Sequence, residues 1–263
     1  MSGGLFVMKC GGSTLASLPG AFFEDLRDLQ ENGPLPVIVH GGGPAINEML
    51  GKLGIESRFV NGLRVTDEAV LDVVEMVLAG QINSEIVRKL NASGARAIGL
   101  SGTDGMLLKA RPVDHHAEIG YVGEVVGVNT ALIRGVAEMG YLPVIAPIGI
   151  DESGQRYNIN ADTAAGAVAS ALGASTMIVV TDVPGIMREI DGEKRVLPEV
   201  SFAQIEEMIA SGEIYGGMIP KVRAAMSCLT GDVKEVRIVD GAEPRVLSRA
   251  IREGNLGTRI VRG

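Results

Sequence analysis

Residues 37–50 read VIVHGGGPAINEML, an apolar strand pattern that runs through His40 into three glycines and then into a helix. Pro44 stands where proline favours the first turn of a helix. Glycine loses the most backbone freedom on folding, so a run of them at this junction needs a reason. A loop without side chains exposes the N–H groups of the helix N-terminus, where the helix dipole attracts anions. The stretch therefore predicts a strand–loop–helix unit that can hold a phosphate group.

The rest of the chain alternates short apolar strands with helical segments. The expected strands are 5–9, 35–40, 95–101, 142–148, 175–182 and 233–240. Most carry apolar residues on both faces, which is typical of a parallel sheet covered by helices on both sides. The expected helices are 21–33, 67–94, 131–140, 161–174, 201–212 and 219–229. The alternation predicts an α/β fold with right-handed crossovers.

Two stretches break this alternation. Residues 57–66 place Asn61-Gly62 between alternating runs, which predicts a β-hairpin. Residues 107–129 are expected to form short antiparallel strands around a polar loop. A soft boundary follows the alanine-rich helix, near residue 173.

Composition and charge exclude several classes of function. The 263 residues carry a formal net charge of −8 and 3% aromatic side chains, with no Trp. We therefore expect neither a nucleic-acid nor an anionic-membrane surface. No run approaches the roughly 20 apolar residues of a membrane span. Cys10 and Cys228 lie far apart and fit no metal spacing, so we expect reduced thiols in a cytoplasmic protein.

Two familiar nucleotide motifs are absent from the sequence. There is no GxxxxGK[ST], and the glycines of GLSGTDG (99–105) do not fit the dinucleotide pattern GxGxxG. A second glycine loop, Gly11-Gly12, does follow the first strand beside Lys9. Two such loops with a neighbouring lysine favour phosphate binding over a purely structural role for the glycines.

Four charged residues are candidates for anion chemistry. Lys9 ends an apolar strand. Lys221 falls in the first turn of a helix, where its repulsion by the helix dipole costs ~0.3–1 kcal/mol unless an anion is also bound there. Asp162 follows the N-cap candidate Asn160, and an acidic residue in the first turn commonly just stabilises a helix. The alternative is that its carboxylate holds the two ammonium groups. Arg64 offers a fork suited to a carboxylate, and its alternative is a routine surface arginine.

The histidines are not expected to act as bases or ligands. His40 should pack beside the glycine loop, and His115 and His116 should lie in a surface loop. No spacing in the chain fits a metal site, so we expect none.

Taken together, these motifs resemble those of the amino acid kinase family and, within it, of the kinases that act on N-acetyl-L-glutamate. The similarity covers essentially the whole chain. It is carried by VIVHGGGPAINEML together with KCGGS (9–13), NGLRVTD (61–67), NINADTAAGAVA (158–169), TDVPGIM (181–187), GGMIPKV (216–222) and GTRIV (257–261).

The resemblance implies a fold and an activity. The fold would be a three-layer αβα sandwich with a long, mainly parallel central sheet. The activity would be transfer of the ATP γ-phosphoryl group to the side-chain carboxylate of N-acetyl-L-glutamate, in arginine biosynthesis, with Mg²⁺ accompanying ATP. Residues 1–173 would form the lobe that binds the amino-acid substrate and dimerises, and residues 174–263 the lobe that binds ATP.

The resemblance also assigns roles to individual residues. Lys9 and Lys221 would flank the migrating phosphoryl group, and Asp162 would orient both lysines. The remaining assignments are Gly11, Gly12, Gly42 and Gly43 for phosphate; Gly42, Gly43, Arg64 and Asn158 for substrate; and Thr181, Asp182, Gly185, Met218 and Lys221 for the nucleotide.

The family that the sequence resembles also includes hexamers that are inhibited by arginine and are joined through an additional N-terminal helix. Here only MSGG precedes the first strand, and the segment 243–260 lacks the histidine expected near the effector pocket. We therefore expect a homodimer that does not respond to arginine.

Two alternatives remain open from the sequence. A sister enzyme would phosphorylate aminoadipate or glutamate attached to a carrier protein. A non-catalytic nucleotide or metabolite sensor on the same fold is the second alternative, although a sensor need not keep Lys9, Lys221 and Asp162 together.

Overall fold

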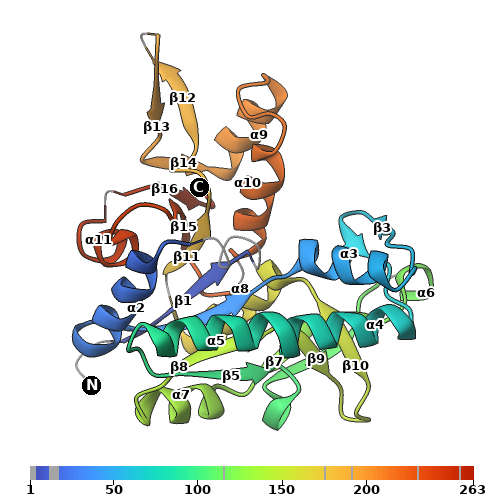
Figure 1. The fold of residues 1–263 in the computed structure, drawn as a ribbon. Coiled ribbons are helices and arrows are strands. Elements are labelled where there is room, and N and C mark those ends of the chain that lie inside the picture. Colours follow the sequence, from blue (N-terminus) through green and yellow to red (C-terminus); the bar gives the residue numbers. More distant parts are fainter. Residues whose placement is uncertain are drawn as a thin grey trace.

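A central sheet organises the chain in the computed structural model, which describes residues 4–11, 18–114, 116–174, 176–190, 192–229, 231–254 and 256–263 (Figure 1). In these residues eight strands pair in the order β14-β16-β15-β11-β1-β2-β8-β5. Their bounds are β1 (Leu5–Cys10), β2 (Leu35–His40), β5 (Ala97–Ser101), β8 (Leu142–Ala146), β11 (Thr176–Thr181), β14 (Glu199–Ser201), β15 (Glu235–Asp240) and β16 (Thr258–Val261). All six expected strands are present in this sheet.

The sheet is mainly parallel, as expected. Lys9 on β1 stands opposite Val39 of β2 on one side and Val179 of β11 on the other, in parallel register. Among the described strands of this sheet, the pair β15–β16 is the antiparallel exception. Because parallel strands end at the same edge, the loops after β1, β2, β8 and β11 lie together.

Helices cover both faces of the sheet, which confirms the three-layer αβα architecture. One face carries α2 (Gly20–Asn32), α3 (Gly43–Lys52), α4 (Glu68–Glu75), α5 (Asn83–Ala92) and α11 (Val246–Arg252). The other carries α7 (Thr130–Glu138), α8 (Ala161–Leu172), α9 (Phe202–Ala210) and α10 (Met218–Ser227). The two faces have separate apolar cores.

Strand β1 contributes side chains to both cores. Phe6, Met8 and Cys10 belong to the first core, whereas Val7 belongs to the second. Side chains alternate between the faces of a strand, so Lys9 points to the side of Val7, which α8 covers. The apolar strand thus presents its one charged side chain to the N-terminal end of a helix.

The expected long helix over 67–94 is not a single regular helix. Helix α4 passes into a π-helical segment, η1 (Met76–Ile82), before α5 begins at Asn83. A π-helical segment is rare and is often found next to functional sites. Its Leu78 and Ile82 are buried against the first core.

The predicted hairpin at 57–66 and the antiparallel strands expected within 107–129 are both confirmed. Strands β3 (Phe59–Val60) and β4 (Leu63–Arg64) meet at Asn61-Gly62, and both of these residues have positive φ, as a tight hairpin turn requires. Farther along, β6 (Leu108–Pro112) and β7 (Val122–Val128) pair antiparallel on either side of α6 (His116–Ile119). They join β9 (Ile148–Ile150) and β10 (Arg156–Ile159) in a small closed barrel.

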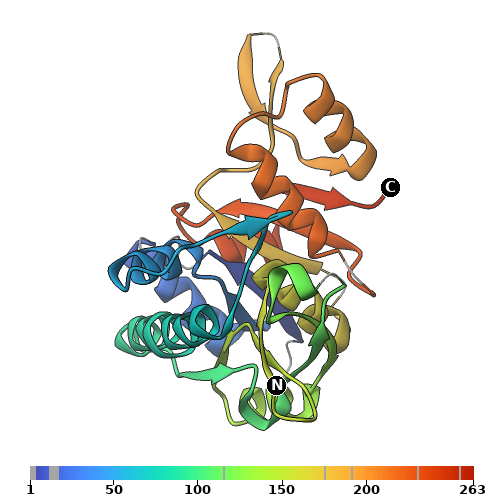
Figure 2. The ribbon, with the colours of Figure 1, turned by 90° about the vertical axis from the view of Figure 1, so that its right-hand side faces the viewer.

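An exposed hairpin, β12 (Met187–Ile190) with β13 (Glu193–Val196), has no counterpart in the sequence predictions. It projects with α9 from one end of the molecule, whereas the small barrel lies at the other end (Figure 2). No helix in the described part of the chain is both long and apolar enough to cross a membrane.

Candidate functional site

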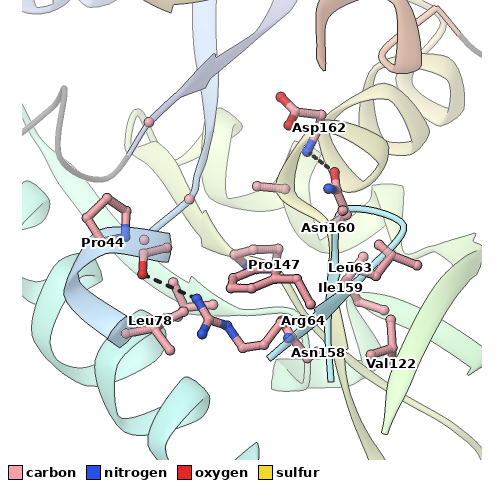
Figure 3. Close-up of a pocket in the computed structure, with 18 of the residues that line it drawn as sticks. Pro44, Leu63, Arg64, Leu78, Val122, Pro147, Asn158, Ile159, Asn160 and Asp162 are labelled. Carbon is pink, nitrogen blue, oxygen red and sulfur yellow. Dashed lines mark hydrogen bonds between the residues drawn. The ribbon is translucent and has the colours of Figure 1, made fainter. Parts of the chain in front are cut away.

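The loops at the carboxyl ends of β1, β2 and β8 enclose a cavity of about 310 Å³ (Figure 3). The N-terminal ends of α3 and α8 and the hairpin β3–β4 complete its walls. Sequence-predicted residues that line it are Lys9, Gly11, Gly42, Gly43, Arg64, Asn158 and Asp162. All seven were assigned to phosphate binding, substrate binding or catalysis, and the fold brings them together. Gly12 lies outside the described residues.

The glycine loop after β2 serves both packing and access. A Cβ on Gly42 would overlap the methyl groups of Leu78 and Ile82 in the π-helical segment, so no side chain fits there. A Cβ on Gly43 would meet no described atom within 4 Å. Gly42 is the N-cap of α3 and has no side-chain cap, so the first N–H groups of this helix stay available to a ligand.

Lys9 and Asp162 form an ion pair at the cavity wall. Lys9 Nζ lies 2.7 Å from Asp162 Oδ1, and the two side chains are 14% and 13% exposed. This oxygen is buried and accepts no well-directed hydrogen bond within the described residues, so the contact is an electrostatic one. Asn160 caps α8 by accepting from the N–H of Asp162 at 2.8 Å, which aims the carboxylate toward β1.

Lys221 lies elsewhere in this structure. Its Nζ donates to Asp182 Oδ1 at 2.5 Å, and this contact lowers the pKa of the Asp182 carboxyl. Asp162 therefore pairs with Lys9, whereas the expectation that it orients both lysines is not met in these positions. The Asp182 side chain is 74% exposed, and such an exposed pair contributes only ~0–1 kcal/mol. An anionic ligand can thus compete for the Lys221 ammonium.

Arg64 is a buried cation without an acid. It is 7% exposed, and burial lowers the pKa of its guanidinium. The group donates to Ser57 Oγ at 2.5 Å and to the Gly43 carbonyl at 3.3 Å, and it stacks 4.7 Å above the Phe59 ring. In the described part of the chain no carboxylate lies within ion-pair distance of it. A buried charge needs a counter-charge, so this cavity is built for an anion.

Thr66 holds Arg64 and Asn158 in one arrangement. Its hydroxyl donates to the Arg64 carbonyl at 2.8 Å and accepts from Asn158 Nδ2 at 3.1 Å. Thr66 is fully buried, and the sequence predictions did not include it. Its position two residues after Arg64 is the signal from which it could have been found.

Only two of the five residues assigned to the nucleotide line a second cavity, of about 510 Å³, near the exposed hairpin. Gly185 and Met218 line it. Thr181 and Asp182 do not, and the Thr181 hydroxyl instead bonds the backbone of the turn after β11. Thr181 therefore holds the turn that leads to the cavity, whereas the Asp182 side chain pairs with Lys221.

Two residues next to the site were not assigned a role from the sequence. His40 was expected to pack without acting as a base; it is fully buried, and burial lowers its pKa to about 4. Asn83, at the start of α5, contacts its ring and was missed, because 43 residues separate them. Within the described residues no group of three potential ligands can hold a metal ion.

The chain is similar in sequence and in fold to known proteins. The profile of the amino acid kinase family matches residues 4–240. An acetylglutamate kinase of Geobacillus kaustophilus is 54% identical over 235 residues, 89% of each chain. One from Syntrophomonas wolfei is 44% identical over 258 residues, 97% of this chain and 90% of the relative. The crystal structure of smu.665 from Streptococcus mutans UA159 superposes with a TM-score of 0.82 at 31% identity, over 98% of this chain and 99% of that one.

The packing of the glycine loop predicts different stabilities for three alanine variants. Gly42→Ala should lower the free energy of unfolding by about 1–3 kcal/mol, because its methyl group overpacks Leu78 and Ile82. Gly43→Ala should change it by less than ~0.5 kcal/mol, because nothing opposes the methyl group. Gly51→Ala, in the open part of α3, is the matched control and should raise it by ~0.5–1 kcal/mol. Urea unfolding measures all three, and a larger loss at position 43 than at 42 would contradict this packing.

Proposed function

The chain belongs to the amino acid kinase family, and from this we propose that it transfers the γ-phosphoryl group of ATP to the side-chain carboxylate of N-acetyl-L-glutamate. The product is N-acetyl-L-glutamyl 5-phosphate, an intermediate of arginine biosynthesis. One observation carries the proposal. The cavity that holds the Lys9–Asp162 pair and the glycine loop also holds Arg64, a buried guanidinium without an acidic partner in the described part of the chain.

Arg64 and Asn158 bind the substrate in this proposal. The α-carboxylate of an acetylated amino acid supplies the negatively charged partner that Arg64 lacks within the described residues. The geometry of the guanidinium group suits a carboxylate. Asn158 reaches the same cavity from β10. The side-chain carboxylate of the substrate then extends toward Lys9.

The reaction requires positioning and charge stabilisation more than proton transfer. A side-chain carboxylate is ionised at neutral pH, so it attacks without a general base. That agrees with His40, whose lowered pKa and burial leave no accessible base at the loop. Lys9 and the N–H groups of Gly11, Gly42 and Gly43 stabilise the negative charge on the transferring group. Asp162 holds Lys9 in place.

Residues 174–263 bind the nucleotide in this proposal, and residues 1–173 bind the amino acid. Gly185 and Met218 line the second cavity, where the base and sugar fit. Lys221 leaves the exposed Asp182 to meet the phosphates, because a polyphosphate offers it more negative charge than one carboxylate. Thr181 holds the turn that shapes this end of the site.

Magnesium enters as part of the MgATP substrate. The described residues offer no cluster of three ligands, and Asp162 and Asp182 at the site are each paired with a lysine. Mg²⁺ commonly keeps several waters and is held by substrate phosphates with few protein carboxylates. The residues present fit that mode of binding.

The activity assay that tests the proposal traps the acyl phosphate with hydroxylamine. Purified protein, MgATP and N-acetyl-L-glutamate should give the hydroxamate, with far less product from N-acetyl-L-aminoadipate or free glutamate. Preference for aminoadipate would favour the carrier-linked sister activity. Binding of both ligands without hydroxamate would favour a sensor.

The substrate role of Arg64 predicts a change in KM. Arg64→Lys keeps the charge but loses the fork, and we expect KM for N-acetyl-L-glutamate to rise about 10- to 150-fold, equivalent to ~1.5–3 kcal/mol for a charged hydrogen bond. KM for ATP should stay within about twofold. Arg58→Ala, on the exposed approach to the same hairpin, is the control and should leave both unchanged. An equal rise in both KM values would place Arg64 outside the substrate site.

We extend the proposal to a cytoplasmic homodimer. Strand β5 ends the described sheet, and Ile98 on it and Met76 on the adjacent η1 are 38% and 57% exposed. A free strand edge with apolar neighbours is a surface that a second copy can cover by twofold pairing. The buried, unpaired thiols of Cys10 and Cys228 suit a reducing compartment.

Light scattering should give twice the 27.5 kDa mass of one chain. Met76→Glu should shift the population to monomer, because it places a charge in the covered surface. Met139→Glu, 63% exposed at the end of α7 on the other face, should not. A dimer unaffected by Met76→Glu would move the interface elsewhere.

A further inference from the structure

A buried set of hydrogen bonds connects the start of α5 to the glycine loop. His40, the last residue of β2, is 0% exposed, and its Nδ1 lies 3.1 Å from the carbonyl oxygen of Gly41. On the opposite side of the ring, Asn83 Nδ2 lies 3.1 Å from His40 Nε2 and 2.9 Å from the carbonyl oxygen of Val144. Neither His40 nor Asn83 lines the cavity, so any effect on the reaction passes through the loop.

These contacts decide which ring nitrogen carries the proton. A backbone carbonyl can only accept, so the side of the Asn83 amide that faces Val144 is the NH₂ group. The same NH₂ group faces His40 Nε2, which must therefore accept. Burial lowers the pKa of His40 to about 4, so the ring is neutral near pH 7. Its single proton is on Nδ1, which donates to Gly41.

The bond to Gly41 fixes the direction of the next N–H group. In the trans peptide between Gly41 and Gly42, the C=O and the N–H point in opposite directions. With the carbonyl held toward the buried ring, the Gly42 N–H turns toward the cavity that both glycines line. It donates no hydrogen bond within the described residues, so it is available to a ligand.

We propose that His40, held by Asn83, is a positioning residue that aims the Gly42 N–H at the transferring phosphoryl group. The inference rests on the proposed function, since a phosphoryl group in the cavity is what this donor would serve. Loss of one such donor lowers kcat by about 10²–10³ in a well-studied protease. Misdirecting a donor that remains present should cost about tenfold or more.

The arrangement extends to the edge of the sheet. Gly99 on β5 packs directly against the Asn83 amide, and a Cβ there would overlap Asn83 Oδ1. Gly99 does not line the site cavity. A methyl group at this distant position should therefore disturb the reaction by displacing Asn83.

Two substitutions of His40 separate positioning from packing. His40→Asn places an amide nitrogen where Nδ1 stood, so it can still donate to Gly41. His40→Gln reaches toward Asn83 and removes that donor. Both put a neutral amide into the same buried space, so each serves as the control for the other.

In the hydroxamate assay, His40→Gln should lower kcat about tenfold or more, with KM for ATP and N-acetyl-L-glutamate within about twofold. His40→Asn should keep kcat within about threefold. Circular dichroism normalises each rate to folded protein. Equal kcat values for the two variants would overturn the inference, because a merely structural role affects both alike.

Further measurements cover variants that fold poorly and failure of the proposed function. Gly99→Ala should lower kcat with KM unchanged, and wild-type kcat in a variant whose crystal structure shows Asn83 displaced would overturn the inference.

If the wild-type protein makes no hydroxamate, the proposed function fails. Crystal structures of the two His40 variants then decide the inference: a reoriented Gly41–Gly42 peptide only in His40→Gln supports it, and the same orientation in both overturns it.

Discussion

A cation at the end of a strand that is buried on both faces must find a counter-charge, and this requirement organises the site. Alternation along β1 sends Lys9 to the face that α8 covers, and the first turn of α8 supplies Asp162 at 2.7 Å. The helix is held there by its Asn160 cap. This one ion pair therefore joins the end of β1 to the first turn of α8 at the wall of the cavity.

The other cations at the site lack such a fixed partner. Arg64 has only neutral groups around it within the described residues, and Lys221 rests on an acid that is mostly exposed. The protein thus neutralises one positive charge internally and leaves the others for ligands. Because the overall charge is −8, the proposed binding of two anionic substrates would depend on these local positive groups.

Much of the fold could be predicted from the sequence because its signals are local. Apolar runs gave the six expected strands, and Asn61-Gly62 gave the hairpin. The hairpin β12–β13 was missed because its residues are exposed and carry no apolar alternation. The π-helical segment and the His40–Asn83 contact were missed because they depend on packing between distant segments. The ion pair between Lys221 and Asp182 was likewise missed, because it depends on the spatial position of the turn after β11.

Strand β1 pairs with β2 on one side and β11 on the other, so the chain on both sides of residue 173 contributes to one hydrogen-bonded ladder. A backbone cut at that position would leave two fragments, each exposing an unpaired strand edge, β1 in one and β11 in the other. Neither fragment would have a complete hydrophobic layer, and each would be the natural template for refolding the other. The soft boundary near residue 173 therefore does not divide the central sheet, to which both parts of the chain contribute strands.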